Sequence, residues 1–236
     1  MTPLAAPLHA PSPAGTIDAS SSHDLASAIA AVEEDIVLNR LHPRERLTED
    51  ELMQRFGLKR HMVRELLAEL ARLGLLERRK NVGAEVRFFT VREVMELYAV
   101  RELLETEAVR QVPCPPAPND LQRLIAVQER HDAAVRAEDP RLVFRTNIEF
   151  HQTLFGLCEN TVLQKAIQEY ARQTHPIRFS TLVSADYRSR SQHEHWQMIE
   201  ALRDGRRDML VALCREHLTP SRDGYLAANR HLAEGA

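Results

Sequence analysis

The sequence predicts a mainly α-helical protein of two domains, with one small β-hairpin in the first domain. Its 236 residues are enough for two domains that each bury a hydrophobic core. The composition is 44% hydrophobic but only 5% aromatic, with 8 glycines, which suits helix packing better than an antiparallel sandwich. Apolar residues also recur at steps of three and four over most of the chain, which is the period of an amphipathic helix.

The chain begins with a segment that is not expected to fold. Residues 1–23 are rich in proline, alanine and serine, and they lack the basic start and the apolar core of a signal peptide. We interpret them as a disordered tail. No apolar run approaches the roughly 18 residues needed to cross a bilayer, so no membrane association is expected. Three scattered cysteines without a CxxC pair fit a reducing, cytoplasmic location.

The first folded domain is expected at residues 24–88. A helix over Asp24–Leu41 places its apolar residues on one face, and "LHPRERL" follows it as a turn. Thr48 and Glu51 form a capping box that begins a short second helix, which ends near Gly57.

A longer third helix and a hairpin complete this domain. The segment "LKRHMVRELLAELARLG" has one apolar face and stops at Gly74, since glycine readily adopts the left-handed conformation that follows a helix. The segment "LLERRKNVGAEVRFF" alternates loosely around a turn at Asn81–Gly83. This pattern predicts two short strands joined as a β-hairpin.

Residues 89–236 are expected to form an antiparallel all-α helical bundle. A second capping box at Thr90 opens a helix over Val91–Gln111, which the prolines of "VPCPPAP" must end. Asp139 and Pro140 supply an N-cap and a first-turn proline for a later helix. The further helices are expected at residues 119–137, 140–158, 160–174, 188–204, 206–218 and 220–231.

A basic surface is confined to the first domain, because the whole chain has a net charge of -3. Between Arg55 and Arg87 there are nine Lys or Arg residues and four Glu residues, a local charge of +5. A short helix, a turn and a longer helix match a helix-turn-helix, whose second helix can enter the major groove of DNA. The candidate DNA-binding residues at the start of that helix are Lys59, Arg60, His61 and Arg64.

Arg60 and Arg64 lie one helical turn apart, so both guanidinium groups face the same way and suit guanine edges or phosphates. The hairpin tip adds two arginines and Lys80 where a wing would meet DNA, and Gly83 would let the backbone approach closely. The alternative is a solvated basic helix, or a winged fold that contacts protein. The order of capping box, turn, basic helix and wing favours DNA binding.

The first domain resembles the DNA-binding domain of a known family. "RLTEDELMQRFGLKRHMVRELLAELARLGLLERRKNVGAEV" is similar to the winged helix-turn-helix of the GntR family of bacterial transcription regulators. The resemblance implies that Arg60 and Arg64 are the principal DNA contacts and that Asn81–Gly83 assist. Arg44 stands where the family prefers glycine, and Lys59 replaces the usual serine or threonine cap; these departures bear on which operator is bound.

Polar side chains point towards the helical core of the second domain. Asn147 and His151 share one side of a helix with apolar residues, and His195 and His217 lie on the apolar stripes of two later helices. A single histidine in this position is usually a satisfied core residue. Three unpaired buried imidazoles would be costly, whereas a metal ion uses their lone pairs. Zinc, nickel, copper and iron all suit imidazole nitrogen.

The second domain resembles the FCD ligand-binding domain of the FadR subfamily within the GntR family. The resemblance rests on "N-x-x-F-H" as it occurs here, on "H-x-x-x-I-x-A-L-x-x-G" and on "R-E-H-L". It implies a divalent ion, zinc or nickel, held by Asn147, His151, His195 and His217. Aspartate is the commoner residue at the first position, so the neutral amide should lower metal affinity and favour an anionic effector.

Arg101 stands where the family often has an arginine that points into the ligand cavity. It could bind a carboxylate of the effector, or form an ion pair with Glu102 or Glu105. Tyr98, Arg145 and Arg178 could also line the cavity.

These observations predict an effector-responsive transcription regulator that binds operator DNA as a homodimer and senses a small organic acid. The alternative from another class is a metal-dependent hydrolase or lyase that uses the three histidines. Such an enzyme would need a general base, but Glu149 and Glu194 are angled away from the expected site. No catalytic residue is assigned. A third alternative is a helical dimer with a purely structural bundle.

Overall fold

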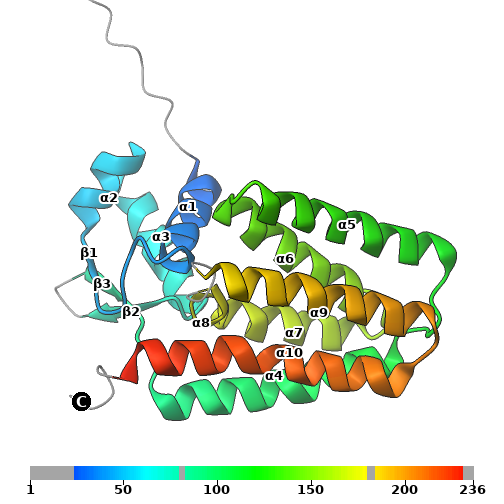
Figure 1. Ribbon diagram of the computed structural model, residues 1–236. Coiled ribbons are helices and arrows are strands. Elements are labelled where there is room, and N and C mark those ends of the chain that lie inside the picture. Colours follow the sequence, from blue (N-terminus) through cyan, green and yellow to red (C-terminus); the bar gives the residue numbers. More distant parts are fainter. Residues whose placement is uncertain (1–23, 80–82, 180–183, 231–236) are drawn as a thin grey trace, which may run out of the picture.

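The computed structural model describes residues 24–79, 83–179 and 184–230 of the chain. Figure 1 shows a small N-terminal unit of three helices and a sheet beside a larger bundle of long helices. The mainly helical fold, the sheet in the first unit and the all-α second unit confirm the fold class expected from the sequence. Within the described residues, no helix has both the length and the apolar character needed to cross a membrane.

The N-terminal unit has a core of aliphatic residues between helices and sheet, including Val63, Leu66 and Leu70. Thr48 and Glu51 form the predicted capping box. Three strands, in the order β1-β3-β2, form an antiparallel sheet. The elements of this unit are α1 (Leu25–Val37), β1 (Arg46–Leu47), α2 (Glu49–Phe56), α3 (Arg60–Arg72), β2 (Leu76–Arg79) and β3 (Gly83–Val86).

The strand β1 corrects the sequence analysis, which treated "LHPRERL" as a turn only. Arg46 and Leu47 pair with Glu85 and Ala84 of β3. A strand of two residues has too few side chains to show an alternating pattern, so only its partner reveals it.

Backbone geometry shows the local consequence of both departures from the GntR pattern. Arg44 has φ 68°, a left-handed conformation in which glycine is unstrained, so a family preference for glycine has a steric reason here. Lys59 is the N-cap of α3 and makes no side-chain hydrogen bond to the helix. Gly83 has φ 98°, and a Cβ atom there would lie 2.7 Å from the carbonyl oxygen of Leu47. This glycine is therefore needed for the approach of β3 to β1, whatever it contributes near DNA.

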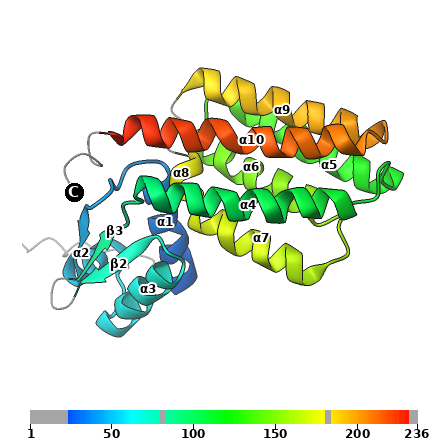
Figure 2. The ribbon, with the colours of Figure 1, turned by 90° about the horizontal axis from the view of Figure 1, so that it is seen from below.

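The C-terminal unit is a bundle in which α4 packs against α7 and α10, and α5 packs against α6 and α9 (Figure 2). Its main core is built of buried aliphatic and aromatic side chains from these helices, such as Leu124, Phe150 and Met198. The elements are α4 (Val91–Gln111), α5 (Pro118–Arg136), α6 (Pro140–Phe155), α7 (Thr161–Gln173), α8 (His175–Phe179), α9 (Ala185–Arg203) and α10 (Arg207–Ala228).

The prediction of two last helices, at 206–218 and 220–231, was wrong. A single helix, α10, passes through Pro220. Proline cannot donate to the carbonyl of Glu216, but Leu218, Ser221 and Tyr225 remain buried and extend one continuous packed face beyond the proline. Burial of that face outweighs the lost hydrogen bond. The short helix α8 was also not predicted.

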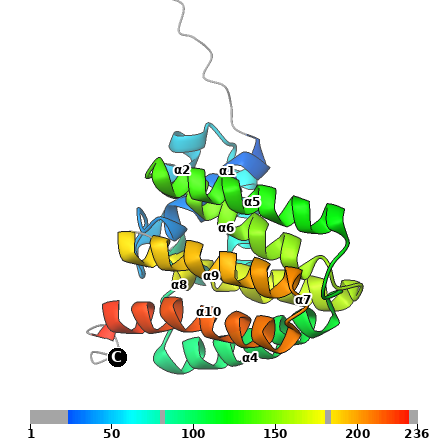
Figure 3. The ribbon, with the colours of Figure 1, turned by 45° about the vertical axis from the view of Figure 1, so that its right-hand side comes forward.

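The two units are in contact, and α1 lies at the junction between them (Figure 3). Val37 of α1 packs with Val143 and Phe144 of α6. The backbone N–H of Phe89 donates to the hydroxyl of Tyr225 at 3.2 Å, and the two rings meet edge to face. The bundle therefore contacts α1, a helix of the N-terminal unit, directly.

Candidate metal centre, ligand cavity and DNA-binding surface

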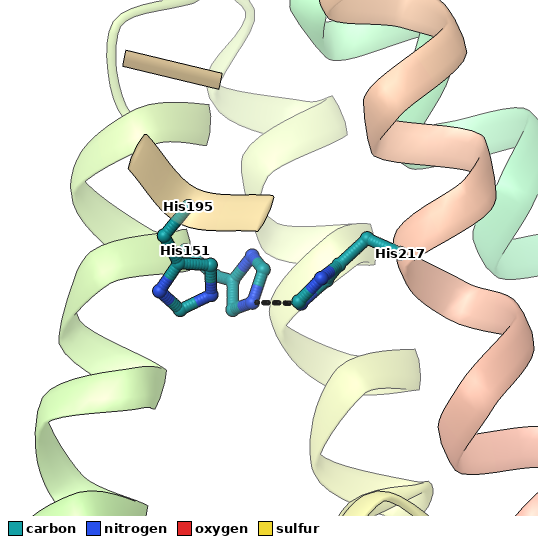
Figure 4. Close-up of side chains that lie close together, drawn as sticks. All are labelled: His151, His195 and His217. Carbon is teal, nitrogen blue, oxygen red and sulfur yellow. Dashed lines mark hydrogen bonds between the residues drawn. The ribbon is translucent and has the colours of Figure 1, made fainter. Parts of the chain in front are cut away.

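Three buried histidines from three helices converge in the bundle (Figure 4). His151 comes from α6, His195 from α9 and His217 from α10. The ring centroid of His151 is 5.1 Å from that of His195 and 5.0 Å from that of His217, and the centroids of His195 and His217 are 5.0 Å apart. One nitrogen of each ring lies within 4.8 Å of the other two. The structure thus brings together three of the four residues proposed as ligands.

Neighbouring side chains fix which nitrogen of His195 carries the proton. Its Nδ1 lies 2.8 Å from Oε1 of Gln128, whose amide NH₂ donates to the carboxylate of Asp132 at 2.7 Å. Because a carboxylate only accepts, the amide oxygen of Gln128 faces His195 and accepts from Nδ1–H. The Nε2 lone pair of His195 is then buried with no hydrogen-bond partner in the described part of the chain.

His217 is oriented in the same way. Its Nδ1–H donates to the carboxylate of Glu194 at 2.6 Å, so its Nε2 carries a lone pair. That Nε2 lies 3.2 Å from Nε2 of His151, along the dashed line in Figure 4. In metal sites, the outer nitrogen of a ligating histidine usually donates to a carboxylate or an amide oxygen. This contact directs the inner nitrogen towards the ion.

Burial keeps His151 and His195 neutral. It lowers the pKa of His151 well below the usual value, and the positive charge of Arg178 adds to the effect. Burial likewise lowers the pKa of His195 well below the usual value. Neutral imidazoles are the form that binds a divalent ion, so three ring nitrogens within 4.8 Å of one another fit zinc, nickel or a similar metal.

Asn147 also lies in this part of α6 and is buried, but its oxygen is directed elsewhere. Oδ1 accepts from a guanidinium nitrogen of Arg178 at 3.1 Å, and Nδ2 lies 3.4 Å from the hydroxyl of Ser191. Because arginine only donates, the oxygen must face Arg178 in this arrangement. To ligate an ion, Asn147 would have to give up that contact, and its role as a ligand stays a prediction.

A further buried histidine beside this cluster, His131 on α5, was not predicted from the sequence. Its ring is 5.2 Å from that of His195. The hydroxyl of Thr146 donates to the carbonyl of Leu142 at 2.7 Å, so it accepts from Nδ1–H of His131 at 3.0 Å. Nε2 is left with a buried lone pair and no partner among the described residues, and burial lowers the pKa of His131 to about 4. The stripe of Leu124, Val127 and Ala134 on the same helix face was the available signal.

The two glutamates weighed for the enzyme alternative are both engaged in other contacts. Glu149 pairs with Arg130. Glu194 receives a hydrogen bond from His217 and pairs with Arg190 at 2.7 Å. In this arrangement Glu194 orients a histidine.

A cavity of about 340 Å³ opens beside the histidines, between α1, α4, α6, α7 and α8. His151 reaches its wall, and Arg178 and Glu105 line it as well. Its apolar wall comes mainly from α6 and α7, with Phe155 and Ile167. The volume falls within the range of pockets for small molecules.

Arg101 is almost fully buried, and its Nε and Nη2 hydrogen-bond to Glu105 at 2.8 and 2.7 Å. Of its two sequence-based interpretations, the ion pair is therefore formed, in a buried rather than a surface setting. Nη1 is buried without a hydrogen-bond partner within the described ranges. Arg101 does not line the cavity itself, so its contact with an effector stays a prediction; Arg178 and Arg145 do line it.

The residues proposed to bind DNA lie on an exposed face at the start of α3, where Lys59, Arg60, His61 and Arg64 are all exposed. Arg60 pairs with Glu49 and Asp50 of α2 at 2.9 and 2.7 Å. Arg64 also pairs with Glu49, at 2.9 Å. The carboxylate of Glu49 thus holds both guanidinium groups on one side of the helix. Lys80 and Asn81 lie outside the described residues.

Comparison with known proteins gives two family matches and several similar structures. The FCD domain model matches residues 96–220, and the model of bacterial regulatory proteins of the gntR family matches residues 26–86. A GntR transcriptional regulator from Rhodococcus sp. RHA1 is similar at a TM-score of 0.73 and 20% identity, over 86% of this chain and 98% of that chain. McbR/YncC of E. coli is similar at 0.70 and 19%, over 88% and 97%. Lar of Listeria monocytogenes is similar at 0.59 and 18%, over 86% and 96%. No curated protein sequence matches significantly.

Proposed function

Because the chain belongs to the GntR family of bacterial transcription regulators and carries an FCD domain, we propose that it binds operator DNA as a homodimer and senses a small organic acid beside a metal ion. The observation that supports the sensing site best is the convergence of His151, His195 and His217, each of which has a ring nitrogen within 4.8 Å of the other two. The proposed ion is zinc or nickel.

The cavity supports a carboxylate as the effector. A bound ion would act as a Lewis acid that holds a carboxylate oxygen near His151. The guanidinium of Arg178 lines the same cavity, and it donates a hydrogen bond to the amide oxygen of Asn147. An ion held by three imidazoles and an amide keeps its formal charge of +2, so an anionic ligand is favoured.

The operator should first be recovered by selection from random duplex DNA. Organic acids are then screened by thermal shift, with and without a chelator, on protein purified without a histidine tag. We expect a carboxylate to raise the melting temperature only while the ion is present. Indifference of the protein to every acid and to the chelator would refute the sensing model.

The outer contact of His195 gives a test of the metal centre. Gln128→Leu removes the acceptor of Nδ1–H, and we expect it to weaken metal binding about 10- to 100-fold. Gln192→Leu is a matched control, because Gln192 donates to the same Asp132 at 2.9 Å without touching a histidine. Competition with a chromophoric chelator measures both affinities. Equal affinities of the two variants would mean that Gln128 does not orient His195 towards an ion.

The exposed face of α4 supports the homodimer. Val91, Met95 and Leu103 are 50%, 46% and 71% exposed, and their spacing of four and eight residues places them on one side of this helix. An apolar stripe of this kind favours contact with a second copy, because a twofold axis would bring the same stripe from each chain together.

Leu103→Glu should therefore convert the dimer to monomers. A carboxylate in the middle of an apolar interface would face its symmetry mate and would lose its hydration. Light scattering coupled to size exclusion measures the mass. Val162→Glu on α7 is the control, since Val162 is 76% exposed on a different helix. A monomeric Val162→Glu and a dimeric Leu103→Glu would move the proposed interface from α4 to α7.

A further inference from the structure

The ligand cavity is not confined to the FCD domain. Ala30, Glu33 and Glu34 of α1 line it together with residues of the bundle. Helix α1 belongs to the N-terminal unit, where it packs against α3. Any molecule that fills the cavity therefore touches the DNA-binding unit directly.

Glu33 is the main polar contact between the two units at this cavity. Its carboxylate accepts two hydrogen bonds from Arg172, at 2.8 and 3.2 Å, and one from Nδ1 of His175 at 3.3 Å. Burial by itself would raise the pKa of Glu33, but the hydrogen bonds from His175 and Arg172 lower it to about 2. Glu33 is thus an anion of the N-terminal unit that is bound by the guanidinium of Arg172 and the ring N–H of His175 in the bundle.

A second acidic residue of α1 makes weaker contacts with the bundle. Glu34 contacts single nitrogens of Arg141 and Arg145, which are 58% and 56% exposed. Glu34 is buried, but both arginines are more exposed than Arg172, which is 41% exposed, so solvent screens these single contacts more. The two-point contact of Arg172, with the buried His175 beside it, is the stronger tie.

A carboxylate ligand would need the same partners as Glu33. Arg172 and His175 line the cavity, as Arg178 does, and the Nε/Nη2 edge of Arg172 that holds Glu33 can take only one pair of carboxylate oxygens. Placing a second carboxylate beside Glu33 would bring like charges together at low dielectric constant. Exchange of one carboxylate for the other keeps the charge balance of the cavity unchanged.

We propose that an anionic effector takes the place of Glu33 on Arg172 and His175, and so releases α1, with the DNA-binding unit, from the bundle. This inference rests on the proposed function and specifies how that site regulates DNA binding. Val37 stays packed on Phe144, so the C-terminal end of α1 acts as the pivot. Because the two occupants exclude each other, the free energy of ligand binding is coupled to the position of the DNA-binding unit.

The test uses Glu33→Gln, which keeps the shape of the side chain and removes its charge. Asp35→Asn is the matched control, because Asp35 is 5% exposed and Glu33 8%, but Asp35 pairs with Arg40 and Arg55 of its own unit. Spin labels at Glu65→Cys in α3 and Arg123→Cys in α5, in a Cys114→Ser background, report the distance between the units. Labelled protein is diluted with unlabelled protein so that each dimer carries one labelled protomer.

We expect Glu33→Gln to shift or broaden the distance distribution without any ligand, and Asp35→Asn to keep that of the parent protein. Acetate, used as the smallest carboxylate, should move the parent protein towards the distribution of Glu33→Gln, and should have no further effect on that variant. Chloride at the same ionic strength should have no effect. On the selected operator, Glu33→Gln should change the DNA affinity by about 5- to 150-fold.

The proposal is overturned if Glu33→Gln and Asp35→Asn give the same distances as the parent protein, or if acetate and chloride act alike. Failure of the proposed function is a separate result. If the protein retains no metal but Glu33→Gln still changes the distances, the metal centre is refuted and this mechanism stands. If the melting temperature responds to carboxylate and chelator but the distances do not change, the sensing site stands and this mechanism is refuted.

Discussion

Replacement of both Arg60 and Arg64 by alanine should abolish specific binding to the operator. Each guanidinium group that reads a guanine edge contributes about 1–3 kcal/mol, so each single variant should bind about 5- to 150-fold more weakly. Both side chains lie on the exposed N-terminal turns of α3, where a recognition helix meets base edges. In the free protein both arginines pair with Glu49, and DNA would replace Glu49 as their partner.

Arg72→Ala is the control for this prediction. Arg72 is a basic residue of the same helix, 68% exposed, but it lies at the C-terminal end and pairs with Glu69. Fluorescence anisotropy on the selected operator and on a scrambled duplex separates specific from general binding. Parent-like affinity of the double variant for the operator would show that α3 is not the recognition helix.

Acid should strongly destabilise the metal-free protein, prepared with a chelator, because several buried histidines are neutral in the folded state. Burial lowers the pKa of His175 to about 4, and burial lowers that of His131 to about 4 as well. Below the ordinary value of 6.5 the unfolded chain takes up protons that the folded chain does not. The stability from each histidine is therefore present above pH 6.5 and is lost as the pH falls towards 4.

The size of this effect is about 3 kcal/mol for each of these two histidines, which is large beside a total stability of about 5–15 kcal/mol. Urea unfolding of chelated protein across the window from pH 6.5 to pH 4 measures it. His175→Gln should make the pH dependence of stability less steep, since an amide can still donate to Glu33 but does not titrate. The exposed His193→Gln should leave it unchanged. A pH dependence equally steep in both variants would contradict the assignment.

Local signals in the sequence predicted much of the fold. The capping boxes at Thr48 and Thr90 are formed as expected, because a cap depends only on residues three positions apart. Helical stripes placed His151, His195 and His217 on buried faces, and these faces do meet. The family resemblance added the order of the two domains, which the family matches support.

Other features depend on contacts between residues that are distant in the chain, which local patterns do not encode. Pro220 sits inside α10 because the face around it packs on α4, where the hydroxyls of Tyr98 and Ser221 are 2.9 Å apart. The direction of the Asn147 amide is decided by Arg178, thirty-one positions further on. The helical stripe on α5 could have indicated that His131 is buried, but only the structure shows that His195 of another helix lies beside it.

The sequence by itself determined most of the helices, the basic character of α3 and the inward direction of His151, His195 and His217, since all three follow from periodicity and charge over a few turns. Only the tertiary structure decided that α1 closes the ligand cavity and that Glu33 of one unit sits on Arg172 of the other. The physical reason is that an ion pair between residues 139 positions apart is set by how two units pack, and no local pattern of side chains encodes that packing.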